Sequence, residues 1–240
     1  GVSIGSDDYI KAAADSFAAS LSEGEPGSTA HEKAVIDFNL GAAYSALGEY
    51  RLSAEHLAPA LEFYNQYEYP EENAALRRSL GAAYSALADE RLDAGDIEGA
   101  AEYLGSAAFA YRTGSLSGEY SHVKAREGRL FSELALGNND CSRAIRAIEC
   151  YKDASDYYSD SGHAEERILV RDALSALYDF LGSYEAPTPE QALGAYAEIA
   201  EACSDGVSPA VYGQARRYLR GFGGRGRQDL QPREGYRVIF

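Results

Sequence analysis

Apolar residues recur along most of the chain at the three- and four-residue spacing of an amphipathic helix, in phrases that repeat. Residues 40–50 read LGAAYSALGEY and residues 80–87 read LGAAYSAL. Residues 174–184, LSALYDFLGSY, carry the same phrase, and residues 128–137, GRLFSELALG, are a looser copy. A second apolar stretch follows each phrase after a short Gly, Asn or Pro break. The pattern predicts an all-α solenoid of four helical hairpins, over residues 30–70, 71–116, 117–161 and 162–207.

The repeats are unevenly spaced. From Gly41 to Gly81 the distance is 40 residues, and from Gly81 to Gly128 it is 47. The extra residues, at about 88–94, amount to nearly two helical turns, so the apolar stripe returns to almost the same face. We therefore expect a longer second hairpin that leaves the repeat unbroken.

The segments that flank the repeats differ from them in composition. Residues 1–29 predict one amphipathic helix, over 6–22, and then a Gly/Pro/Ser linker. Residues 208–220 open with Ser-Pro and predict a last helix that caps the exposed end of the repeats. Residues 221–240 are rich in Gly and Arg, and we expect a tail that is flexible over 221–234 and ends in the apolar run YRVIF.

The repeated phrases resemble the tetratricopeptide motif, a helix–turn–helix unit with the signature Leu-Gly, Tyr, Gly-x-Tyr, Ala, an aromatic residue or Leu, and Ala. The resemblance covers roughly residues 34–204 and is strongest in the first two hairpins. The matching residues are Leu40, Gly41, Tyr44, Gly48, Tyr50, Leu57, Ala60 and Leu61, then Leu80, Gly81, Tyr84, Gly95, Ala100, Leu104 and Ala107, and finally Leu174, Tyr178, Gly182, Tyr184, Ala192 and Tyr196. The resemblance implies a right-handed superhelical solenoid that holds other proteins.

Tetratricopeptide arrays bind a partner segment in a concave groove, which the first helix of each hairpin lines. Carried over by alignment, the resemblance implies a groove formed by Val35, Phe38, Ala42, Ser45, Arg78, Ala82, Ser85, His122, Arg129, Ser132, Glu133, Asp172, Asp179 and Phe180. Some family members clamp a C-terminal carboxylate with several basic residues, but here only Arg126 occupies such a position. The predicted groove combines small, apolar and charged residues, which favours as partner an extended protein or peptide segment that is basic and carries apolar anchors.

Charge and cysteine content narrow the choice of partner and compartment. The formal net charge is -16 and the pI is about 4.6, so phosphate backbones are repelled and a nucleic-acid partner is not expected. No apolar run approaches the ~20 residues of a membrane span, so membrane insertion is not expected. Cys141, Cys150 and Cys203 fit packing positions in a reducing compartment, which favours the cytoplasm. The sequence begins with Gly1 and has no Met, so a removed signal peptide is also compatible with it.

Sequence motifs for catalysis, metals and cofactors are lacking. His31 and His56 lie in the first predicted hairpin, His122 in the third and His163 in the fourth, and none is three or four residues from another His or a Cys. Gly221, Gly223 and Gly226 spell G-x-G-x-x-G, but they follow a predicted helix and not the strand that a dinucleotide site needs. We therefore expect no enzyme activity, no metal and no cofactor.

The leading hypothesis is a non-catalytic scaffold or adaptor. One alternative is a trafficking adaptor, because residues 147–162 resemble the long acidic hairpins of the SNAP family. Another is a structural subunit that assembles into an oligomer or filament when Tyr236, Val238, Ile239 and Phe240 dock on the next copy.

Overall fold

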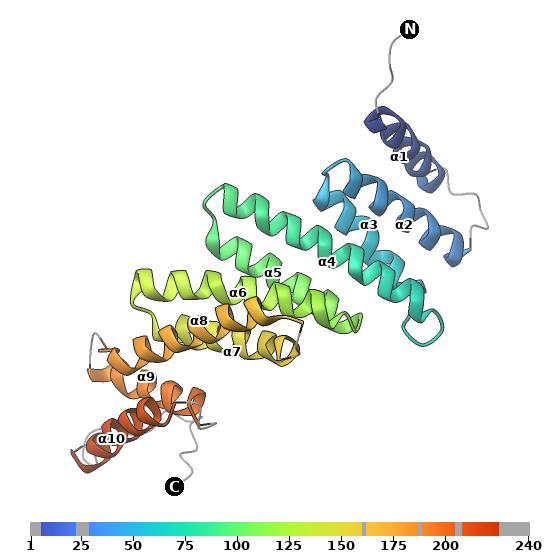
Figure 1. Ribbon diagram of the computed structural model, residues 1–240. Helices are drawn as coiled ribbons and strands as arrows, with labels where there is room; N and C mark the ends of the chain where they lie inside the picture. Colours follow the sequence, from blue (N-terminus) through green and yellow to red (C-terminus); the bar gives the residue numbers. More distant parts are fainter. Residues whose placement is uncertain (1–5, 23–28, 160–161, 187–188, 205–207, 226–240) are drawn as a thin grey trace. The chain divides into compact units, whose positions relative to one another are not determined.

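A computed structural model describes residues 6–22, 29–159, 162–186, 189–204 and 208–225 (Figure 1). Within these ranges every regular element is an α-helix, and no strand occurs. Adjacent helices pack against each other, as in an αα solenoid, so the predicted all-α class is confirmed. The helices are α1 (Ser6–Ser22), α2 (Ala30–Ala46), α3 (Tyr50–Phe63), α4 (Pro70–Asp93), α5 (Ile97–Thr113), α6 (Ser117–Asn138), α7 (Cys141–Tyr158), α8 (Ala164–Ser183), α9 (Pro189–Ala202) and α10 (Pro209–Arg225).

The chain divides into two compact units. The first unit comprises Gly1–Leu130 and Cys150–Val170, and the second comprises Phe131–Glu149 and Arg171–Phe240. In the first unit each helix from α1 to α4 packs on the next, and α2 also touches α4. In the second unit α9 packs on α10, where the Tyr196 and Tyr218 rings stack with centroids 4.0 Å apart.

Capping groups set the ends of the helices in the first unit. The Thr29 hydroxyl accepts a hydrogen bond from the Glu32 N–H, and the Glu32 carboxylate accepts one from the Thr29 N–H, which forms a capping box at the start of α2. The turns after α2 and α4 each contain a glycine in the left-handed region, with φ of 79° at Gly48 and 77° at Gly95. The residue after each glycine donates its N–H back across the last turn, so these helices end in Schellman motifs.

Helix α4 is longer than the first helix of the preceding hairpin. It has 24 residues and α2 has 17, and the extra turns lie where the sequence carries its insertion. These turns bring Asp89 onto the same helix as the repeated LGAAYSAL phrase. The insertion therefore extends the surface of α4 that is available to a site.

The glycine of each repeated phrase lies where two helices approach closely. A Cβ built on Gly81 would lie 2.6 Å from the Tyr111 ring of α5, and one built on Gly128 would lie 3.2 Å from the Tyr151 ring of α7. Beside Gly81 on α4, Leu80 and Ala83 are buried in a core cluster that also contains Leu57 of α3. The Leu-Gly pair thus marks the contact between the two helices of a hairpin.

The last helix extends beyond its predicted end. We expected a helix over 208–220 and flexible chain from residue 221, but α10 continues to Arg225. Glycine lowers helix propensity without stopping a helix, and the chain has no proline between Pro209 and Pro232. The remainder of the predicted tail, with Tyr236, Val238, Ile239 and Phe240, lies outside the described residues. Among the described helices none is both long and apolar enough to cross a membrane.

Candidate functional site: a hollow beside the first helices of two hairpins

The first unit contains a hollow of about 600 Å³ between α4 and α6. Helix α4 contributes Ala82, Ser85, Ala86 and Asp89 to its lining, and α6 contributes Glu119, His122, Val123 and Arg126. Both sets have the offsets i, i+3, i+4 and i+7, so each occupies one face of its helix. Each of the two helices therefore presents one face to the same hollow.

Small residues form the part of the lining nearest the helix backbones. Ala82, Ala86 and Gly118 carry little or no side chain, and Ala82 is exposed. A Cβ at Gly118 would lie 3.0 Å from the Tyr157 hydroxyl, so glycine at this position leaves room for the Tyr157 ring beside α6. The small residues thus keep the space between the two helices open.

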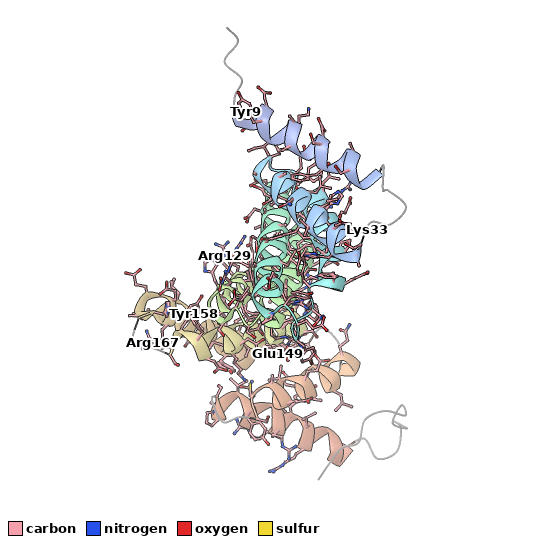
Figure 2. The ribbon with its side chains drawn as sticks, turned by 90° about the vertical axis from the view of Figure 1, so that its right-hand side faces the viewer. Tyr9, Lys33, Arg129, Glu149, Tyr158 and Arg167 are labelled. Carbon is pink, nitrogen blue, oxygen red and sulfur yellow. The ribbon has the colours of Figure 1, made fainter. Side chains whose placement is uncertain are left out.

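Aromatic rings from the end of α7 and the segment before α8 form another part of the lining. The His163 ring centroid lies 4.9 Å from that of Tyr157 and 5.7 Å from that of Tyr158. The two tyrosine rings meet edge to face, with centroids 5.9 Å apart. Tyr158, labelled in Figure 2, is buried, and its burial, with Glu166 nearby, raises the pKa of its hydroxyl. These rings form a rigid, partly polar surface.

Charged side chains complete the lining. Arg126 of α6 forms an ion pair with Asp89 of α4. Beside the hollow, the Arg78 Nε of α4 donates a 3.0 Å hydrogen bond to the Glu119 Oε1 of α6. Glu166, in the first turn of α8, is exposed and forms no ion pair with a described residue. Since exposed ion pairs stabilise a fold only slightly, their main effect here is to place charges around the hollow.

The predicted groove residues divide into those that line this hollow and those that do not. Ala82, Ser85 and His122 line the hollow. Arg78 does not line it, but its side chain is hydrogen-bonded to Glu119, which does. Arg129 lies further along α6 with an exposed side chain (Figure 2). Val35, Phe38, Ala42 and Ser45 lie on α2, where they are exposed or half-buried and take no part in the hollow. The remaining predicted residues belong to the second unit, namely Ser132, Glu133, Asp172, Asp179 and Phe180.

Sequence reasoning missed the residues that the second helices and the next hairpin contribute. Tyr111, Tyr157 and Tyr158 lie outside the predicted groove, and the rings of Tyr111 and Tyr158 are buried. His163 and Glu166 carry no motif at all. Only the packing of α7 beside α6 brings these side chains to the hollow, and the local sequence pattern holds no signal for it.

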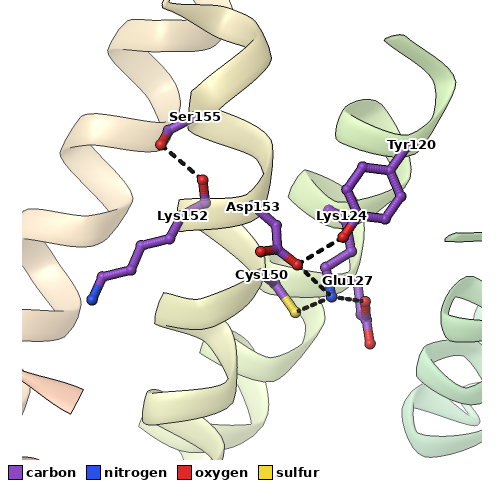
Figure 3. A network of polar contacts seen from close by, with 7 residues as sticks. All are labelled: Tyr120, Lys124, Glu127, Cys150, Lys152, Asp153 and Ser155. Carbon is purple, nitrogen blue, oxygen red and sulfur yellow. Dashed lines mark hydrogen bonds and ion pairs between the residues drawn. The ribbon is translucent and has the colours of Figure 1, made fainter. Parts of the chain in front are cut away.

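A partly buried polar network joins α6 to α7 next to this surface (Figure 3). Lys124 Nζ donates hydrogen bonds to Glu127 Oε2 at 2.8 Å and to Cys150 Sγ at 3.2 Å, and it lies 3.8 Å from Asp153 Oδ2. The Tyr120 hydroxyl donates to the same Asp153 oxygen at 2.8 Å. Burial alone would lower the pKa of Lys124, but its contacts with Glu127 and Cys150 outweigh burial and raise it. The network fixes α6, and hence its hollow-lining face, against α7.

The Cys150 thiol gives this network a pH dependence. Burial raises its pKa from an ordinary value near 9 to about 12, so the folded state keeps the proton at pH values where the unfolded chain loses it. Because the folded state then binds more protons, the free energy of unfolding must fall as pH rises from about 9 towards 12. In urea titrations at pH 8 to 11 we expect a shallower fall for Cys150→Ala than for the wild type. Equal slopes would show that the thiol does not titrate in this way.

Within the part of the chain that the structure describes, no group of three or more His, Cys, Asp or Glu side chains is placed to hold a metal ion. Cys141, Cys150 and Cys203 are all buried. The hollow itself is lined by a mixture of small, aromatic and charged groups.

Comparison with known proteins adds little to this description. No protein family model matches the chain, and no curated protein matches it. One solved structure, BtubC (BKLC) from P. vanneervenii, is 15% identical, and the match covers 96% of this chain and 98% of that one with a TM-score of 0.36. At that TM-score the likeness carries no argument about fold or function.

Proposed function

We propose that the chain is a non-catalytic scaffold or adaptor that binds an extended segment of a partner protein in the hollow between α4 and α6. The observation that carries the proposal is that one face of α4 and one face of α6, each with the offsets i, i+3, i+4 and i+7, border a single space of about 600 Å³. The tetratricopeptide resemblance supports the same surface, because it assigns Ala82, Ser85 and His122 to a partner groove. A reducing compartment such as the cytoplasm suits the buried cysteines.

The physical character of the hollow suits a polypeptide. Tyrosine rings supply apolar contact area at a low cost in side-chain entropy, and their hydroxyls supply hydrogen bonds. Small residues allow a partner's backbone to approach α4 closely, while the charged side chains select among segments. A space of this size accepts only a few side chains, so the contact is made by a short segment and not by a whole domain.

Site-specific photo-crosslinking tests this function. With benzoylphenylalanine in place of His122, we expect a discrete crosslinked partner from a lysate of the source cells, because this position lines the hollow. The same group in place of Glu102, an exposed residue of α5 away from the hollow, should give no such product.

A second substitution identifies the surface that captures the partner. Ala82→Trp fills the hollow and should abolish the His122 crosslink, whereas Ser106→Trp, at an exposed position on α5, should leave it unchanged. A crosslink that persists in the Ala82→Trp background would contradict the proposal.

A further inference from the structure

We infer that the hollow accepts an arginine side chain of the partner segment, whose guanidinium lies against the aromatic rings and pairs with Glu166 and Glu119. The inference rests on the proposed function, since it names the residue that the same hollow selects. It follows from three features of the lining: its rings, its carboxylates and its net charge.

The half-buried rings of Tyr157 and His163 supply the surface on which a guanidinium stacks, and the buried Tyr158 ring supports both of them. Tyr157, Tyr158 and His163 contact one another, with centroid distances of 4.9 to 5.9 Å, so each ring is held in place by the others. A guanidinium is planar and weakly hydrated, and it stacks on aromatic faces more readily than an ammonium group does. Rings that are already fixed lose little freedom when such a group binds.

The carboxylates supply acceptors. Glu166 has no ion-pair partner among the described residues, and Glu119 contacts Arg78 through Oε1 alone. Asp89 already pairs with Arg126, so the one arginine of the lining is neutralised. A planar guanidinium with five N–H donors matches carboxylate oxygens presented by two different helices, α6 and α8.

The balance of charge decides between a cationic and an anionic occupant. The lining holds three carboxylates, on Asp89, Glu119 and Glu166, and one arginine, on Arg126. The whole chain has a formal net charge of -16, which attracts a basic segment and repels an acidic one. The same surplus of carboxylates argues against a carboxylate-clamp ligand.

A displayed pool of random 12-residue peptides, selected at pH 7.5 on the immobilised full-length chain, tests the inference. Parallel selections on the Ala82→Trp and Ser106→Trp variants show which peptides need the hollow. Some selected peptides should fail to bind the Ala82→Trp variant but still bind the Ser106→Trp variant. We expect these peptides to share one arginine. In a synthetic copy of a selected peptide, citrulline in place of that arginine keeps the shape and removes the charge, and it should weaken binding about tenfold.

A double comparison identifies the acceptor. Glu166→Gln should weaken binding of the arginine peptide about fivefold or more and leave the citrulline peptide unchanged, because only the charged partner uses the carboxylate. The inference is overturned if the peptides that need the hollow share no arginine. It is also overturned if Glu166→Gln weakens binding of the arginine peptide and of the citrulline peptide equally. Either result leaves the proposed binding function standing. If no peptide depends on the hollow, the proposed function fails with it.

Discussion

Replacing Lys124 with methionine is expected to lower the free energy of unfolding by about 3 kcal/mol. The methionine side chain has a similar length but no charge, so it leaves the Glu127 carboxylate, which is only 6% exposed, without its cation. It also removes the hydrogen bond that Lys124 donates to Cys150, and it removes the lysine charge that lies 3.8 Å from Asp153 Oδ2. An uncompensated buried carboxylate is costly because the helices around it cannot replace water as its partner.

Two control variants separate this cause from the general effect of losing a lysine. Lys33→Met makes the same change at an exposed position of α2 (Figure 2), and it should alter stability by less than about 0.5 kcal/mol. The double variant Lys124→Met with Glu127→Leu removes both charges and should recover most of the loss. Urea denaturation followed by circular dichroism measures all three. A loss below about 1 kcal/mol for Lys124→Met would mean that the network does not hold α6 to α7.

The second large effect is expected at the close contact between α4 and α5. Gly81→Ala should lower the free energy of unfolding by about 2 kcal/mol, because the new Cβ would lie 2.6 Å from the buried Tyr111 ring. The ring cannot yield without disturbing the packing of α5 on α4. Tyr111 also lines the hollow, so the same variant should weaken binding of the partner segment.

Gly105→Ala provides the matched control for this change. Gly105 lies inside α5 in the same unit, and a Cβ there would meet only the Glu127 carboxylate oxygen at an ordinary 3.8 Å. Alanine has the higher helix propensity, so this variant should gain about 0.5–1 kcal/mol. If the two substitutions change stability by the same amount and with the same sign, close packing at Gly81 is not the reason for the glycine.

The sequence predicts the helices well because the signals that form them are local. The repeated LGAAYSAL phrase, the capping box at Thr29 and the glycines at positions 48 and 95 each act within a few residues of chain. The end of α10 shows the limit of such signals. Glycines at positions 221, 223 and 224 weaken a helix without forbidding it, and the helix continues through them to Arg225.

The candidate site was only partly predictable. Ala82, Ser85 and His122 follow from alignment of the first helices, because a repeat places equivalent residues on equivalent faces. Tyr157, Tyr158, His163 and Glu166 could not be found in this way, since they reach the hollow from the end of one hairpin and the start of the next. The Lys124 network was missed for a similar reason, because Lys124 and Cys150 are far apart in sequence and meet only through packing of α6 on α7.

The most direct test of the binding function is the affinity of the crosslinked partner segment for three forms of the chain, measured by calorimetry. Ala82→Trp closes the hollow, Ser106→Trp adds the same side chain elsewhere on the first unit, and the wild type is the reference. We expect binding to Ala82→Trp to be at least about tenfold weaker than to the wild type, with Ser106→Trp unchanged. An Ala82→Trp variant that binds the segment within about twofold of the wild type would contradict the assignment of this hollow as the binding site.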